Sequence, residues 1–119
     1  MLLNAIIERL KKGSIKNVVA FSDTDVIPKM PYVVVKPENG AIENTRQYRI
    51  IVHHTQGRLD ELEAYAMNEI DRLLSGHISF QGSRYKLYKG GYTDITVEPQ
   101  DGTYFFERLF YSPLQGFNQ

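Results

Sequence analysis

The feature that most constrains this chain is an alternating stretch followed by a helical one, between Thr45 and Gly76. The first part reads RQYRIIVHH, and successive side chains of a strand point to opposite faces. One predicted face carries Tyr48, Ile50, Val52 and His54, and the other carries Arg49, Ile51 and His53. The pattern therefore predicts a strand with one mostly apolar face, ending at Gly57.

The second part predicts a long amphipathic helix from Arg58 to Ser75. The apolar residues at helical spacing are Leu59, Leu62, Ala66, Ile70 and Leu73, with Met67 and Leu74 on the flank. Acidic side chains gather at the predicted N-terminus, where the helix dipole favours them, and Gly76 ends the helix. At 1.5 Å per residue such a helix is about 27 Å long. We expect the face with Leu62, Ala66, Ile70 and Leu73 to pack on a sheet.

The remaining pattern predicts one more helix and several strands. One predicted helix ends at a cap at Gly13, and its apolar residues at helical spacing are Leu3, Ile6, Ile7 and Leu10. Strand-like stretches are KNVVAF, YVVVK, HISF, RYKLY, YTDITVEP and TYFFERLFYSP. The unbroken valines of YVVVK predict burial on both faces. Asn39-Gly40 and Asp101-Gly102 predict turns.

Most predicted connections have hairpin length, which favours an α+β fold over a parallel α/β fold. The expected fold is a mainly antiparallel sheet packed by one long amphipathic helix and a short N-terminal helix. At 119 residues the chain suits a single domain, residues 1–119, with a loose tail at residues 114–119.

Composition excludes several classes of function. Fourteen basic residues balance 14 acidic ones, so no net charge recruits nucleic acid or a membrane. The absence of cysteine excludes disulfides and thiolate metal sites. The start MLLNAIIERLKKG lacks the pattern of a signal peptide, and no apolar run reaches the length of a membrane span. We therefore expect a soluble domain of intracellular type.

The sequence contains no catalytic or metal-binding pattern, so we expect a protein that is not an enzyme and uses no cofactor. His53 and His54 point to opposite faces of one strand, and His77 stands alone, so no metal-ligand spacing is present. The acids of the long helix have an ordinary explanation in its dipole and its solvent face. The serines lack a nucleophile motif, and Gly90-Gly91 lacks the pattern of a phosphate-binding loop.

The stretch SRYKLYKGGY combines basic residues with tyrosines. Arg84, Lys86 and Lys89 interleave with Tyr85, Tyr88 and Tyr92, which are the ingredients of a single-strand nucleic-acid site. The competing interpretation is an exposed strand whose lysines protect a sheet edge. The balanced net charge favours that second interpretation, because phosphate binding needs a local positive excess.

The stretch TYFFERLFYSP carries large apolar groups on both faces of one predicted strand. Phe105, Glu107, Leu109 and Tyr111 share one face, and Tyr104, Phe106, Arg108 and Phe110 share the other. A domain of this size has one core, so one face needs a second cover, and subunit association would provide it. The interface candidates are Tyr104, Phe105, Phe106, Glu107, Arg108, Phe110 and Tyr111.

These elements together resemble the tail terminator proteins, also called tail completion or head–tail joining proteins, of long-tailed bacteriophages and prophages. The resemblance rests on the terminal helix, PYVVVKPE, RQYRIIVHH leading through a glycine into a helix, and the late hairpin ending in YFFERLFYSP. The loop ENGAIEN is short for a segment that would insert into a neighbouring subunit or the tail tube.

The resemblance implies a protomer without catalytic residues that forms a hexameric ring. This ring would cap the tail tube protein, meet head connector proteins and let DNA pass without specific binding. The protein would lie at the tail–head junction of the virion after assembly in the host cytoplasm. Arg84, Lys86, Tyr88 and Lys89 are then candidates to face the bore or a partner. The alternative is a small nucleic-acid-binding module that uses Arg84–Tyr92.

Overall fold

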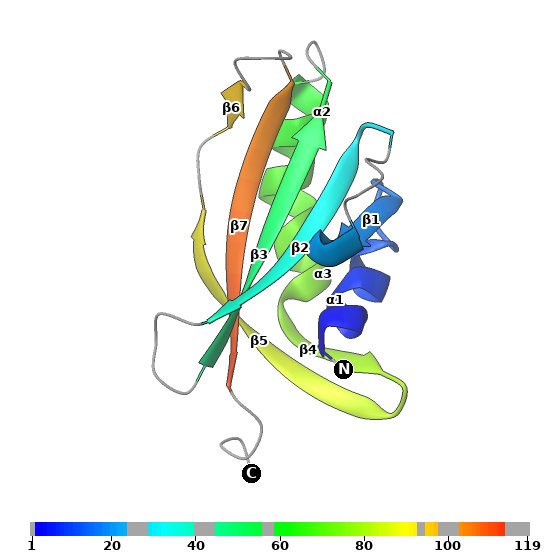
Figure 1. The fold of residues 1–119 in the computed structure, drawn as a ribbon, viewed down its shortest axis with the longest axis vertical. Helices are drawn as coiled ribbons and strands as arrows, with labels where there is room; N and C mark the ends of the chain where they lie inside the picture. Colours follow the sequence, from blue (N-terminus) through cyan, green and yellow to red (C-terminus); the bar gives the residue numbers. More distant parts are fainter. Residues whose placement is uncertain are drawn as a thin grey trace.

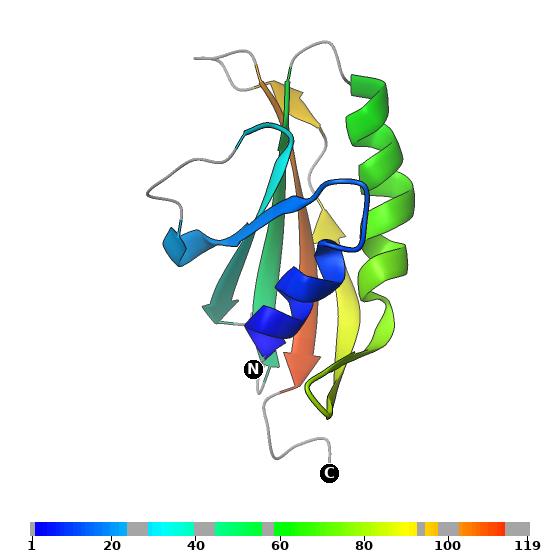
Figure 2. The same ribbon diagram turned by 90° about the vertical axis from the view of Figure 1, so that its right-hand side faces the viewer.

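The computed structural model describes residues 2–23, 29–39, 45–55, 59–92, 95–97 and 103–113, which form a curled sheet with all α-helices on one side (Figures 1 and 2). The helical elements are α1 (Leu2–Leu10), the 3₁₀ turn η1 (Phe21–Asp23), α2 (Leu59–Ala64), the π segment η2 (Tyr65–Glu69) and α3 (Ile70–Leu74). The strands are β1 (Asn17–Ala20), β2 (Tyr32–Asn39), β3 (Thr45–His54), β4 (Gly76–Phe80), β5 (Ser83–Tyr92), β6 (Thr96–Val97) and β7 (Tyr104–Pro113).

Six strands lie in the order β1-β2-β3-β7-β5-β4, and the short β6 pairs with β7. Strand β3 is antiparallel to both neighbours, with Ile50 opposite Val35 on β2 and Arg108 on β7. Strand β5 pairs with β4 along its first half and with β7 along its second, where the register shifts between Lys89 and Tyr92. The β4–β5 hairpin therefore curls away from the rest of the sheet (Figure 1).

The predicted fold class is wrong. Strands make up 54% of the structure and helices 28%, so the fold is mostly β, and the sheet is a mixed half-barrel. The mixed character comes from β1, which is parallel to β2, with Val18 opposite Val33. A parallel pair needs a long connection between its strands. The stretch SDTDVIPKMP provides that length, although residues 24–28 within it lie outside the described part.

The predicted single long helix is also wrong, because the segment is divided into α2, η2 and α3. Its midpoint is a π segment, in which the Ile70 N–H donates to the carbonyl oxygen of Tyr65, five residues earlier. The five-residue spacing of this hydrogen bond changes which positions of the helical segment face the core. Leu62, Tyr65, Ile70, Leu73 and Leu74 are all buried, and the step from Tyr65 to Ile70 is five residues. The 3.6-residue period assumed for the sequence therefore missed Tyr65.

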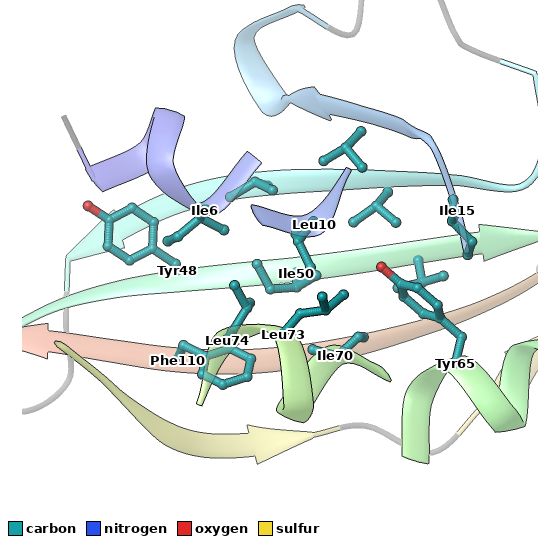
Figure 3. Packing of buried hydrophobic residues seen from close by; sticks show 14 of the residues in the cluster. Ile6, Leu10, Ile15, Tyr48, Ile50, Tyr65, Ile70, Leu73, Leu74 and Phe110 are labelled. Carbon is teal, nitrogen blue, oxygen red and sulfur yellow. The ribbon is translucent and has the colours of Figure 1, made fainter. Parts of the chain in front are cut away.

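The core lies between the helices and the inner face of the sheet, where Figure 3 shows its main side chains converging. One cluster joins the two helices to the sheet. It contains Ile6 and Leu10 of α1, Ile70, Leu73 and Leu74 of α3, and Tyr48, Ile50 and Phe110 of the sheet. Leu62, Ile70 and Leu73 are thus buried as predicted, whereas the side chain of Ala66 lies outside the described part. Each fully buried aliphatic side chain of this kind stabilises the fold by about 1.5–3 kcal/mol.

The close approach of α1 to α3 depends on a glycine. A Cβ atom at Gly13 would lie 2.8 Å from Cδ1 of Leu73 and 3.1 Å from a carboxylate oxygen of Glu69. The Glu69 carboxylate accepts hydrogen bonds from the Ser14 amide and hydroxyl, and Arg9 Nε donates to the Leu73 carbonyl at 2.9 Å. These contacts fix the N-terminal helix to the end of α3.

The N-terminal helix and the buried valine run agree with the sequence predictions. The N-terminal helix is confirmed as α1, and the valine run is confirmed as buried on both faces, since Val33, Val34 and Val35 are at most 5% exposed. The turn at Asp101-Gly102, most of the loop ENGAIEN with the turn at Gly40, and the tail at residues 114–119 lie outside the described residues. Within the described part of the chain, no helix is long and apolar enough to cross a membrane.

Candidate functional site

The face of the sheet opposite the α-helices, here called the open face, is the candidate functional surface. On β7 the burial alternates, with Phe106, Arg108 and Phe110 buried and the residues between them half-buried. The open-face residues of β3 and β7 are Arg49, Ile51, His53, Phe105, Glu107, Leu109 and Tyr111. No α-helix covers this face in the described structure (Figure 2).

An aromatic row crosses one end of the open face. Tyr32, His53 and Phe105 lie opposite one another on β2, β3 and β7. The Tyr32 and His53 rings stack with centroids 4.7 Å apart and planes inclined by 18°, and the Phe105 ring lies 6.1 Å from His53. Cross-strand aromatic pairs of this kind hold the sheet register. Tyr32 is buried, at 9% exposed, so the accessible part of the row consists of His53 and Phe105, which are half-buried.

A cluster of charged side chains occupies the middle of the open face. Arg49 binds Glu38 through Nε at 3.2 Å and Glu107 through Nη1 at 3.0 Å. Gln47 donates a 2.6 Å hydrogen bond to Glu38, and Lys36 lies 3.6 Å from the same carboxylate. The hydrogen bond from Arg49 holds the pKa of Glu38 below its ordinary value, although burial acts the other way. The same bond raises the pKa of Arg49.

Towards β1 the open face is partly covered. The Lys36 ammonium lies 4.7 Å from the centre of the Phe21 ring, which belongs to η1. Since Lys36 is on the open face, η1 also lies on that side. The more open part of the surface therefore spans β3, β7 and the adjoining part of β5 at Tyr88.

The predicted interface candidates of β7 separate into two groups. Phe105, Glu107 and Tyr111 lie on the open face, whereas Phe106 and Phe110 belong to the protomer core and Tyr104 packs against it. Arg108 is also internal. Its Nε and Nη2 atoms donate to the two carboxylate oxygens of Asp71, at 2.9 and 3.1 Å, and Nη1 donates to the Gly90 carbonyl at 2.5 Å.

The basic candidates of β5 also separate. Arg84 and Lys86 alternate along one exposed face of the strand. Lys89 falls on the other face, opposite Phe110, and its ammonium lies 3.4 Å from Asp71. Tyr88 pairs with Tyr111 of the open face and is 48% exposed. The parity of positions 84, 86 and 89 could have shown from sequence that Lys89 does not join the other two.

The adjacent histidines His53 and His54 have separate surroundings in the described structure. His54 is buried and its Nε2 lies 2.9 Å from a carboxylate oxygen of Glu61, while Nδ1 accepts a hydrogen bond from the Thr55 amide. Both ring nitrogens are therefore engaged, with the proton on Nε2. His53 stacks on Tyr32, on the opposite face as predicted. Among the described residues no three His, Asp or Glu side chains gather as a metal site would require.

Sequence reasoning missed Glu38, Arg49 and Asp71 as members of ionic clusters. Their main partners lie on other strands, so the register of the sheet brings Glu38 and Arg49 together, and the packing of α3 on the sheet brings Asp71 to Arg108. The arrangement offers a surface with aromatic and charged parts. No protein-family model matches the chain, and the comparison with curated proteins finds no significant match.

Proposed function

We propose that this chain is a non-enzymatic assembly protein whose copies associate into a closed ring. We further propose that the ring caps the tail tube of a bacteriophage and joins the tail to the head. The observation that carries the proposal is the open face of the sheet. It combines the aromatic row Tyr32, His53 and Phe105 with the neighbouring apolar groups Ile51 and Leu109.

The charges of the open face favour another copy of this chain as its occupant. The cluster contains two cations, Lys36 and Arg49, and two anions, Glu38 and Glu107. A surface with balanced charges suits a partner that is itself balanced, and the whole chain carries 14 charges of each sign. An apolar part beside half-buried charges is also typical of the centre and rim of protein interfaces.

A ring requires the open face to meet a different surface of the next copy. Contact between two open faces would give a two-fold dimer, whereas a head-to-tail contact closes into a ring when the rotation permits. The two ends of the sheet differ, because β1 is a parallel edge strand and β4 is an antiparallel one. That asymmetry is compatible with head-to-tail association.

The six-fold order and the phage partners rest on the sequence resemblance. In this proposal the ring contacts the tail tube protein on one side and head connector proteins on the other, and DNA passes through its bore. The role is geometric, which agrees with the engaged ring nitrogens of His54 and with the ionic clusters that are satisfied within the protomer. The protein would act at the tail–head junction of the virion.

The decisive experiment compares two pairs of substitutions on β7. The open-face pair is Phe105→Ser with Tyr111→Ser, and the core pair is Phe106→Ser with Phe110→Ser. Light scattering after size-exclusion chromatography measures the mass, electron microscopy shows rings, and circular dichroism reports folding. Joining of purified tail tubes to heads measures function.

We expect the parent to form rings, alone or on tail tubes, and the open-face variant to remain folded without forming them. The core variant should fail to fold, because it removes two buried aromatic side chains at about 3–5 kcal/mol each. A parent that stays monomeric at high concentration and does not join tail tubes contradicts the proposal. So does an open-face variant that still forms rings.

A further inference from the structure

The β4–β5 hairpin carries an exposed basic strip, defined as Arg84 and Lys86 of β5 with His77 of β4. His77 lies directly opposite Lys86, and Arg84 lies opposite Ser79, so the basic side chains share one face of the hairpin. All three are exposed. The other face of the hairpin carries Ile78 and Leu87, which are buried in the core, so the basic side chains point away from the core.

No acidic side chain neutralises the strip along the chain. The sequence contains no Asp or Glu between Asp71 and Asp94, so β4, β5 and the turn between them have no acidic residue. Within the described residues, Arg84 and Lys86 form no ion pair. Lys89 provides the contrast, because it points to the other face and pairs with Asp71 at 3.4 Å.

The Lys86 ammonium lies 5.1 Å from the centre of the Tyr88 ring, on the same face of β5. This contact directs Lys86 along the strand, and it leaves Tyr88 48% exposed. The basic strip of Arg84, Lys86 and His77 therefore lies beside the exposed ring of Tyr88.

This chemistry fits nucleic acid better than an acidic protein surface. Interfaces between proteins have apolar centres that are depleted in lysine, and the outward residues His77, Ser79, Arg84 and Lys86 are all polar. Phosphate oxygens accept from guanidinium and ammonium groups, and an exposed tyrosine offers a surface for a base. Backbone contacts of this kind carry no sequence information.

We propose that the basic strip binds the phosphate backbone of nucleic acid without sequence preference. Each protomer carries the strip, so the proposal does not depend on ring formation. Two cations neutralise two phosphates, which gives a slope of log affinity against log salt of about −1.8 for duplex DNA. Raising salt fourfold should therefore weaken binding about tenfold. A ring would present one strip per protomer and would bind more tightly by multivalency.

The experiment measures fluorescence anisotropy of labelled single-stranded and duplex oligonucleotides of two unrelated sequences, at several salt concentrations. The test variant is Arg84→Gln with Lys86→Gln. The matched control is Lys12→Gln with Lys16→Gln, which removes the same charge from two exposed positions next to α1. Poly-glutamate of matched charge serves as a competitor, and light scattering records the oligomeric state of each variant.

We expect binding that weakens with salt, does not depend on sequence, falls at least several-fold in the test variant and is unchanged in the control. No binding at low salt overturns the proposal, as does a test variant that binds like the parent. Poly-glutamate that competes as well as nucleic acid would assign the strip to an acidic protein partner. A test variant that loses rings but keeps its nucleic-acid affinity would assign it to the subunit interface.

Discussion

Arg108 of β7 and Asp71 of α3 form a bidentate ion pair that connects α3 to the middle of the sheet. The Nε–Oδ1 and Nη2–Oδ2 distances are 2.9 and 3.1 Å, and the Arg108 side chain is 9% exposed. The guanidinium also lies 5.4 Å from the Phe110 ring and 5.7 Å from the Tyr92 ring. A buried guanidinium of this kind is tolerated because its N–H groups donate to the Asp71 carboxylate and the Gly90 carbonyl.

Replacing Arg108 by Met should destabilise the fold by about 2–4 kcal/mol, because Asp71 and the Gly90 carbonyl lose their donor. The loss is smaller than for a fully buried pair, since Asp71 is 27% exposed and keeps Lys89. Urea unfolding measures the change. Arg49→Met is the control. It should cost less, because Arg49 is 28% exposed. Equal losses of unfolding free energy in the two variants would mean that the Arg108 pair stabilises the fold no more than the Arg49 pairs do.

The stability of the fold should fall in acid through Asp71 and Glu38. Burial alone would raise the pKa of Asp71, but the hydrogen bond and charge of Arg108, with Lys89, outweigh it and hold the pKa below its ordinary value. The pKa of Glu38 is lowered as well. Both carboxylates therefore stabilise the fold above the ordinary carboxyl pKa values of about 4, and this contribution is lost as the pH falls through the lower values of the folded state.

Urea midpoints measured from neutral pH down to about pH 3 test this expectation. Asp71→Asn and Glu38→Gln should each flatten the acid side of the profile. Glu8→Gln should leave it unchanged, because Glu8 forms only an exposed pair with Lys11. A parent profile that is flat down to the lowest pH would refute the assignment.

Tyr65→Phe should leave the protein as stable as the parent or stabilise it by about 1 kcal/mol. The Tyr65 hydroxyl is buried and has no hydrogen-bond partner in the described structure, so removing it relieves a desolvation cost. Figure 3 shows it directed into the core. Thermal unfolding measures the effect, and Ile70→Ala in the same segment should instead cost about 2–5 kcal/mol. A Tyr65→Phe variant that loses more than Ile70→Ala would mean that the hydroxyl has a partner.

Chelators should not change the melting temperature. A structural metal contributes directly to folding, and His54 cannot bind one while Glu61 and the Thr55 amide engage its two nitrogens. The measurement is a thermal melt with and without a strong chelator. A lower melting temperature with the chelator would show that a metal site exists.

Alternation along single strands could be predicted from the sequence, and it gave the correct faces of β3 and β7. His53 and His54 separate as expected, and so do Phe105 and Phe106. The period of a strand is fixed by the backbone, so one residue fixes the faces of its neighbours. The helical period is less secure, because a π segment changes the phase at Tyr65 without any signal from proline or glycine.

The order of strands could not be predicted, since hairpin-length connections say nothing about which distant strand enters the middle of a sheet. The parallel pairing of β1 with β2 and the position of β7 between β3 and β5 both depend on long-range contacts. The ionic clusters followed from that order. The sequence placed Arg108 on the same strand face as Phe106 and Phe110, but it could not identify Asp71 as the partner of Arg108.

The position of β7 also determines when the sheet can form during synthesis. Strands β3 and β5 both need β7 as a neighbour, and β7 is the last of the described strands to leave the ribosome. Until then each exposes an unpaired edge, and pairing between distant segments is slow because the intervening chain must be closed into a loop. The nascent chain therefore waits for β7, and truncation before Tyr104 would release a chain with two additional open edges, at β3 and β5, that is prone to aggregation.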